Sequence, residues 1–166
     1  MASKKGLGVT IAILVGVVAL SFVVYLIPEN VDTEMKFVVS DFEKYLDDVD
    51  ERTLLLSTTV EESFEDLVNY KSSPEEYFVT ARVTQQQVNS LIIELTLSDE
   101  PPEWTVSYKT YLGALKKLNE QITETVVVAN LIKDNNSNSI DELISKIYEL
   151  RAELLDLIEK SNNSRP

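Results

Sequence analysis

Carboxylates are the residues of this chain whose spacing best suits chemistry, and they gather in two clusters. The clusters consist of Asp47, Asp48, Asp50 and Glu51, and of Glu61, Glu62, Glu65 and Asp66. Residues four positions apart share one face of a helix, so the second cluster would present two pairs of carboxylates. Such pairs can bind Ca²⁺, which needs about six to eight oxygen ligands. Because the sequence has no EF-hand loop, we expect a solvated acidic face and keep a cation site as the alternative.

Other kinds of catalytic and metal-binding residue are missing from the sequence. There is no Cys and no His, which excludes disulfides, thiolate nucleophiles, Ser-His-Asp triads and metal sites ligated by His or Cys. The sequence also has no Gly-rich phosphate loop and no nucleophile elbow. We therefore expect a protein without a catalytic site, a cofactor or a bound metal, and a hydrolase built on paired carboxylates is the remaining enzymatic alternative.

Polar side chains fill the middle of a segment that is otherwise apolar at helical spacing. They are Thr80, Thr84, Gln85, Gln86, Gln87 and Asn89. Either Thr84 or Gln85 must lie close to the apolar stripe between Ala81 and Val88. A polar layer inside a helical bundle can fix the register of the helices, which is the interpretation we favour, or it can line a small-ligand pocket.

Three aromatic residues, Trp104, Tyr108 and Tyr111, follow one another at helical spacing. Such a stripe is usually part of a core, so we expect it to close one end of a bundle. The alternative is an exposed contact with a partner protein, because Trp and Tyr are enriched in binding hot spots.

Two Asn-x-Ser sequons begin at Asn135 and Asn162. We expect both to be exposed. Each is therefore a candidate for N-glycosylation in a host that modifies such sequons outside the cytoplasm.

The charge balance limits the partners of the chain. Its 166 residues include 28 acidic and 15 basic ones, a net charge of −13. This charge repels phosphate backbones, so we expect no nucleic-acid partner. The hydrophobic fraction of 44% is too high for a disordered protein, so we expect a folded domain.

Residues 7–27 form an uncharged run that is long enough to cross a membrane. At about 1.5 Å per residue a helix over this run spans roughly 31 Å, which matches a hydrocarbon core of about 30 Å. Lys4 and Lys5 precede the run and acidic residues follow it. The positive-inside rule therefore predicts a cytoplasmic stub at 1–6, a single pass through the cell membrane and an extracytoplasmic remainder. A cleaved signal peptide is the alternative, although its apolar region is usually shorter.

Small residues recur at every fourth position in the predicted span, at Gly8, Ala12 and Gly16. Such a stripe lets another transmembrane helix approach closely. We keep two interpretations, packing against a second span and simple contact with the lipid bilayer.

Helical periodicity continues after the span, and signals for β-strands are missing. Apolar residues recur every three or four positions in four segments, which are 32–70, 73–97, 103–133 and 139–160. Ser73 with Glu76, and Ser139 with Glu142, predict a capping box at the start of the second and fourth helices. The weak helix formers at 57–59 allow a break in the first helix.

These patterns predict an all-α fold in which an N-terminal transmembrane helix precedes an extracytoplasmic up-down four-helix bundle. The bundle has long helices and occupies residues 28–161, and residues 162–166 form a frayed tail. Short loops make consecutive helices antiparallel, and each helix needs its neighbours because only one of its faces is apolar.

We therefore predict a non-catalytic, single-pass membrane-anchored interaction protein. It would be an accessory subunit or scaffold of a membrane or envelope assembly, and its partners would be the lipid bilayer and other membrane proteins or further copies of itself. The alternative is a sensory-type helical ectodomain that binds a small ligand or a cation.

Overall fold

The computed structural model describes residues 39–136 and 139–166. Over these residues the protein is all-α, with four long helices, one short 3₁₀ helix and no β-strand. The elements are α2 (Phe42–Val68), α3 (Pro74–Leu97), η1 (Pro102–Trp104), α4 (Thr105–Lys133) and α5 (Ile140–Asn163). The all-α bundle predicted from the sequence is confirmed for this part of the chain.

The predicted stub at 1–6 and the predicted span at 7–27 lie outside the described residues, as does the small-residue stripe of Gly8, Ala12 and Gly16. In the part of the chain that the structure describes, no helix has the length and apolar character needed to cross a membrane.

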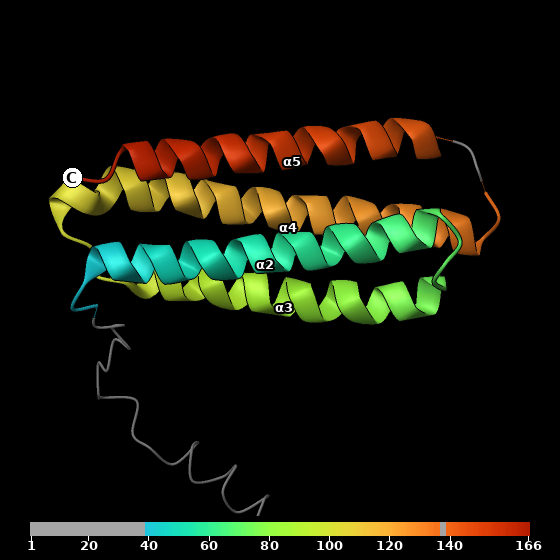
Figure 1. Cartoon of the computed structure of the whole chain (residues 1–166), viewed down its shortest axis with the longest axis horizontal. Helices are drawn as coiled ribbons and strands as arrows, with labels where there is room; N and C mark the ends of the chain where they lie inside the picture. The colour runs from blue at the N-terminus through green and yellow to red at the C-terminus, as the bar shows by residue number, and fades with distance from the viewer. Residues whose placement is uncertain (1–38, 137–138) are drawn as a thin grey trace, which may run out of the picture. The chain divides into compact units, whose positions relative to one another are not determined.

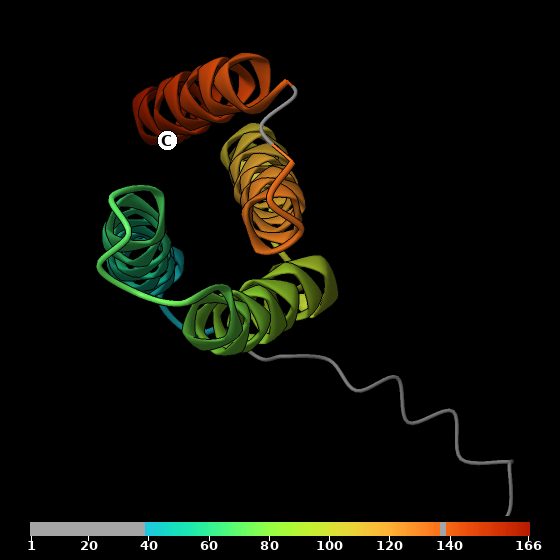
Figure 2. The ribbon, with the colours of Figure 1, turned by 90° about the vertical axis from the view of Figure 1, so that its right-hand side faces the viewer.

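The four long helices lie side by side and alternate in direction (Figure 1). Figure 2 shows them end-on in the order α2, α3, α4, α5, and each packs against its neighbour in the chain. The backbones of α2 and α5 approach less closely, and long side chains join α2 to α5 and to the residues that follow it. Arg151 pairs with Glu61 at 2.8 Å, and Arg165 pairs with Asp47 at 2.5 Å.

A continuous stripe of α2 faces the core, and it includes two polar residues, Thr53 and Ser57. Its buried residues are Leu46, Val49, Thr53, Leu56, Ser57, Val60, Phe64 and Leu67. The hydroxyl of Thr53 donates to the carbonyl oxygen of Val49 at 2.7 Å, which satisfies this polar group inside the core. The hydroxyl of Thr59 bonds in the same way to Leu55. The helix runs unbroken through 57–59, so the break that these weak helix formers allow does not occur.

The start of α2 differs from the prediction of a helix from residue 32. Residues 39–41 are not helical, and residues 32–38 lie outside the described part of the chain. Asp41 is the N-cap, and its carboxylate accepts from the backbone N–H of Lys44 at 3.0 Å. An Asp at this position satisfies a backbone donor that the first turn leaves unpaired, and the helix begins at Phe42.

Of the two predicted capping boxes, the first is confirmed and the second is wrong. The hydroxyl of Ser73 accepts from the N–H of Glu76, and the Glu76 carboxylate accepts from the N–H of Ser73. Ser139 has φ 65° and makes no side-chain cap bond. A capping side chain needs extended backbone at the N-cap, and the left-handed backbone of Ser139 does not provide it.

The C-terminal end is bound to the bundle, whereas the sequence predicted a frayed tail over 162–166. Helix α5 continues to Asn163, and Ser161 is fully buried. The side chain of Arg165 is only 16% exposed and pairs with Asp47. A polar tail was expected to fray because it offers nothing apolar to bury, but these tertiary polar contacts hold it in place.

Candidate functional site

An aromatic cluster closes one end of the bundle, as the sequence predicted. Tyr108 and Tyr111 are buried in the core, and Trp104 is half-buried. The ring centroid of Phe42 lies 6.2 Å from the ring centroid of Trp104 and 6.1 Å from that of Tyr108. Both distances are within the range of favourable aromatic pairs. The other interpretation, an exposed contact for a partner, is wrong for Tyr108 and Tyr111 because their side chains are covered.

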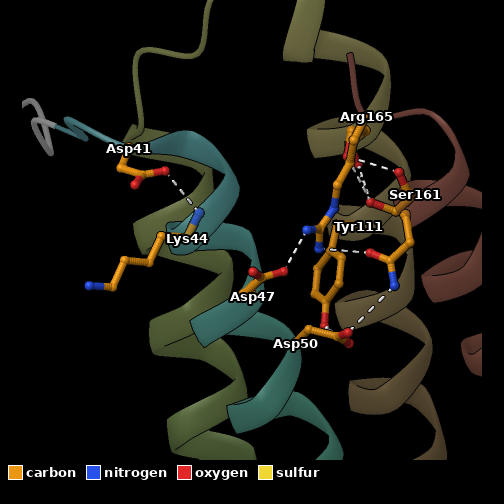
Figure 3. A network of polar contacts seen from close by, with 9 residues as sticks. Asp41, Lys44, Asp47, Asp50, Tyr111, Ser161 and Arg165 are labelled. Atoms are coloured by element: carbon orange, nitrogen blue, oxygen red, sulfur yellow. Dashed lines mark hydrogen bonds and ion pairs between the residues drawn. The ribbon is translucent and has the colours of Figure 1, made fainter.

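A polar network borders this aromatic end and connects α2, α4 and α5. The hydroxyl of Tyr111 donates to Asp50 Oδ1 at 2.9 Å, and the amide of Asn162 donates to Asp50 Oδ2 at 3.5 Å. Arg165 donates to Asn162 Oδ1 at 2.8 Å and pairs with Asp47. Figure 3 shows Tyr111 and Arg165 pointing toward the two aspartates of α2. Burial raises the pKa of Tyr111, so its hydroxyl stays protonated and remains a donor.

A pair of small hydroxyl residues holds α4 and α5 together beside this network. Ser107 and Ser161 are both fully buried. Ser107 Oγ lies 3.0 Å from the Ser161 carbonyl oxygen, and Ser161 Oγ donates to the Ser107 carbonyl oxygen at 2.9 Å. These bonds and the small side chains let the two helices approach closely, so the whole network positions the C-terminal end of α5.

The first acidic cluster supplies the carboxylates of Asp47 and Asp50 to this network. In the described structure these carboxylates connect α2 to α4 and to the C-terminal end of α5. In the second cluster, Glu61 pairs with Arg151 and accepts from the Ser57 hydroxyl at 3.1 Å. Asp66 lies 3.5 Å from the ammonium of Lys71. Across residues 39–136 and 139–166, no group of three or more acidic residues is arranged to hold a metal ion.

A small cavity lies between α2, α4 and α5. Its lining includes Val60, Phe64, Gln121 and Ile147. Gln121 is 1% exposed, and its Oε1 has no hydrogen-bond partner in the described structure. The cavity volume of about 20 Å³ is enough for one water molecule. Pockets for small organic ligands measure about 300–1,000 Å³, so this cavity does not favour the ligand-binding alternative.

The polar residues of α3 are divided between its two neighbours: Gln85 and Asn89 contact α4, whereas Thr80, Thr84 and Gln87 line a groove with α2. Thr84 is buried in the core, as expected for one of the two residues nearest the apolar stripe. Gln85 donates to Thr123 Oγ1 at 3.4 Å. The amide of Asn119 donates to Asn89 Oδ1 at 3.2 Å. Bonds between specific partners on two helices fit the register interpretation of this layer.

The two sequons lie in different surroundings. Asn135 is exposed in the turn after α4 and has φ 52°, and its glycosylation stays a prediction. Asn162 lies within α5, where its amide bonds to Asp50 and Arg165. Modification of Asn162 would require these bonds to open.

The sequence interpretation missed an exposed apolar stripe on α3. Its apolar members are Val79, Val83, Ile93 and Leu97, which are 55%, 45%, 58% and 45% exposed. A shallow groove of about 380 Å³ borders the stripe, and its lining includes Leu55 of α2, which is 67% exposed. The sequence carries a signal for this stripe, because positions 79, 83, 86, 90, 93 and 97 are separated by alternating steps of four and three residues. The inner stripe of the same helix is more apolar and dominates the pattern.

No family model, no curated protein and no solved structure matches the chain.

Proposed function

We propose that the chain is a non-catalytic interaction protein that presents its helical bundle to a protein partner. The observation that carries this proposal is the exposed apolar stripe of α3. Val79, Val83, Ile93 and Leu97 are each at least 45% exposed and fall on one line along the helix. Scattered single apolar residues are normal on a surface. Here two exposed apolar pairs, at 79 and 83 and at 93 and 97, lie on the same face of one helix, and an apolar face at helical spacing is typical of a helix that packs against a partner.

The membrane tether is the second part of the proposal, and it rests on the sequence. The uncharged run at 7–27, with Lys4 and Lys5 before it, supports a single-pass anchor with a cytoplasmic N-terminus and an extracytoplasmic bundle. A tethered bundle without chemistry of its own fits an accessory subunit or scaffold of a membrane assembly.

Site-specific photo-cross-linking tests the interaction role. A photoreactive phenylalanine derivative replaces Val83 in the full chain, and the matched control replaces Leu155 of α5, which is equally exposed at 45%. We expect a discrete protein adduct from position 83 and none from position 155 when cells that express the chain are illuminated. Equal labelling from both positions, or none from either, would refute the proposed role of this face.

Alkaline carbonate extraction tests the tether. Peripheral proteins are released by this treatment, whereas a transmembrane helix stays in the lipid. We expect the chain to remain in the membrane pellet. Recovery in the supernatant would contradict the anchor.

A further inference from the structure

Helix α3 carries two parallel stripes on opposite faces. The inner, buried stripe is Tyr77, Ala81, Thr84, Val88, Leu91 and Leu95. Each residue of the outer stripe comes two positions after a residue of the inner stripe. The outer stripe consists of Val79, Val83, Gln86, Ser90, Ile93 and Leu97, all of them exposed. At 3.6 residues per turn a step of two residues turns the helix by about 200°. The outer stripe therefore points away from the bundle, and its spacing is that of a coiled-coil seam.

The outer stripe has a symmetric pattern. Two apolar residues stand at each end, and the polar pair Gln86 and Ser90 stands in the middle. The pattern is centred on the position of Val88. A second α3 that lies antiparallel therefore brings position 79 opposite 97, position 83 opposite 93 and position 86 opposite 90. Interfaces between two identical chains related by a twofold axis require this kind of self-complementarity.

The central polar layer can form hydrogen bonds between the two copies. The hydroxyl of Ser90 donates to the carbonyl oxygen of Gln86 in its own helix at 3.1 Å. A hydroxyl has one donor and two acceptor positions, so the oxygen of Ser90 can still accept from a Gln86 amide of the other copy. A polar layer of this kind fixes the register of a helix pair.

The outer face of α3 carries few charged residues, so two acidic chains can approach each other there. The chain has a net charge of −13, yet Arg82 is the only charged residue from position 77 to position 93. The nearby Glu75 lies 3.2 Å from the ammonium of Lys133, and Glu94 lies 3.2 Å from the guanidinium of Arg52. Two copies that meet along this stripe therefore bring few carboxylates close together, which keeps their repulsion low.

We infer that the partner of the outer stripe is a second copy of this chain, bound through an antiparallel pair of α3 helices. This inference rests on the proposed function and specifies its partner. The seam covers residues 79–97, roughly 27 Å at about 1.5 Å per residue. The contact would use one helix of each copy, and small interfaces are typical of weak, concentration-dependent association.

Sedimentation of the purified full chain in mild detergent tests the inference, at protein concentrations from about 1 μM to about 1 mM. We expect a monomer–dimer equilibrium. Val83→Glu places a carboxylate against the apolar Ile93 of the other copy and should weaken association at least about tenfold. Ile93→Lys should have the same effect. Leu155→Glu is the control and should leave association unchanged, because Leu155 is exposed to the same 45% but lies on α5.

The double variant Val83→Glu/Ile93→Lys distinguishes an antiparallel pair of α3 helices from a parallel pair. In an antiparallel pair each introduced carboxylate faces an introduced ammonium, so association should return. In a parallel pair like charges would face each other, and association should stay weak. Circular dichroism and Tm of every variant check that the bundle still folds, as the exposure of both positions leads us to expect.

Three results would overturn the inference: a wild-type chain that stays monomeric throughout, a dimer insensitive to Val83→Glu, and a double variant without recovery. A dimer insensitive to Val83→Glu would place self-association in another segment. If position 83 cross-links to a different protein while the chain sediments as a monomer, the proposed function survives and only self-association fails.

Discussion

Tyr111 connects the core to the acidic face of α2. Its ring is fully buried, and its hydroxyl reaches Asp50 at 2.9 Å. Hydrogen bonds to charged groups contribute about 1.5–3 kcal/mol, more than those between neutral groups. The Asp50 carboxylate is half-buried, so it cannot replace this donor fully with water.

The variant Tyr111→Phe removes the donor and keeps the ring. We expect it to lower the free energy of unfolding by about 1–3 kcal/mol, measured by urea denaturation. Tyr148→Phe is the matched control, because Tyr148 is 55% exposed and should show a change below about 0.5 kcal/mol. Equal effects of the two substitutions would show that the bond to Asp50 contributes nothing.

Gln121 presents the opposite case, a buried polar atom without a partner. Gln121 is one of the residues that line the small cavity between α2, α4 and α5, and its Oε1 has no hydrogen-bond partner in the described structure. An unsatisfied buried group costs about 1–3 kcal/mol. Gln121→Met keeps a similar volume and removes the polar atoms. We expect the free energy of unfolding to stay the same or to rise by about 1 kcal/mol. A clear loss of stability would mean that the amide is held by a bonded water that methionine cannot retain.

The two Ser residues that precede α3 and α5 make different contributions to their helices. Ser73 forms the cap of α3, and Ser139 in its left-handed backbone forms none. We expect Ser73→Ala to lower the free energy of unfolding by about 0.5–2 kcal/mol. Ser139→Ala is the control and should change it by less than about 0.5 kcal/mol. A larger loss at position 139 would indicate that its hydroxyl caps α5 in solution.

Glu76 gives the cap of α3 a dependence on pH. The backbone N–H of Ser73 and then its hydroxyl hold the pKa of Glu76 below its usual value. The carboxylate therefore stabilises the fold above the unfolded pKa of about 4.3, and this stabilisation is lost as the pH falls through the lower folded pKa. Glu76→Gln keeps an acceptor but cannot titrate. We expect the stability advantage of the wild type over this variant to shrink between about pH 5 and pH 3. A constant difference would contradict the assignment.

Helix positions were largely predictable because apolar periodicity and caps are local properties. The Ser73 box could be read from four residues, and α3 begins where it predicts. Ser139 shows the same sequence signal without the cap, because backbone dihedrals at a helix start depend on how the preceding turn joins two packed helices. Thr53 is polar but fully buried, since its hydroxyl donates to the carbonyl oxygen of Val49 within its own helix.

The candidate interaction face was harder to predict for a different reason. Val79 and Ile93 stand outside the stronger inner stripe, and only packing shows which face of a helix stays exposed. Arg165 and Asp47 form an ion pair although they lie near opposite ends of the described sequence. No local pattern encodes such a contact, so the ordered C-terminus could not be anticipated.

Two electrostatic effects oppose each other over the whole molecule. The net charge of −13 favours expansion by self-repulsion. Ion pairs such as Arg151 with Glu61 and Arg165 with Asp47 join α2 to α5, where the backbones approach least closely. Each of these pairs keeps one solvent-exposed member, Arg151 or Asp47. Solvent screening therefore limits each pair to about 1 kcal/mol, and we expect repulsion to be the larger effect.

Added salt should therefore stabilise this bundle. Raising NaCl from about 0.05 to about 0.5 M shortens the screening length and weakens both effects, so Tm should rise in calorimetry. The double substitution Glu62→Lys/Glu65→Lys separates screening from general salt effects, because both side chains are exposed on α2 and the net charge falls in magnitude by four units. This variant should have a higher Tm at low salt and a smaller increase with salt. A wild-type Tm that falls as salt is added would mean that the ion pairs across α2 and α5 outweigh the repulsion.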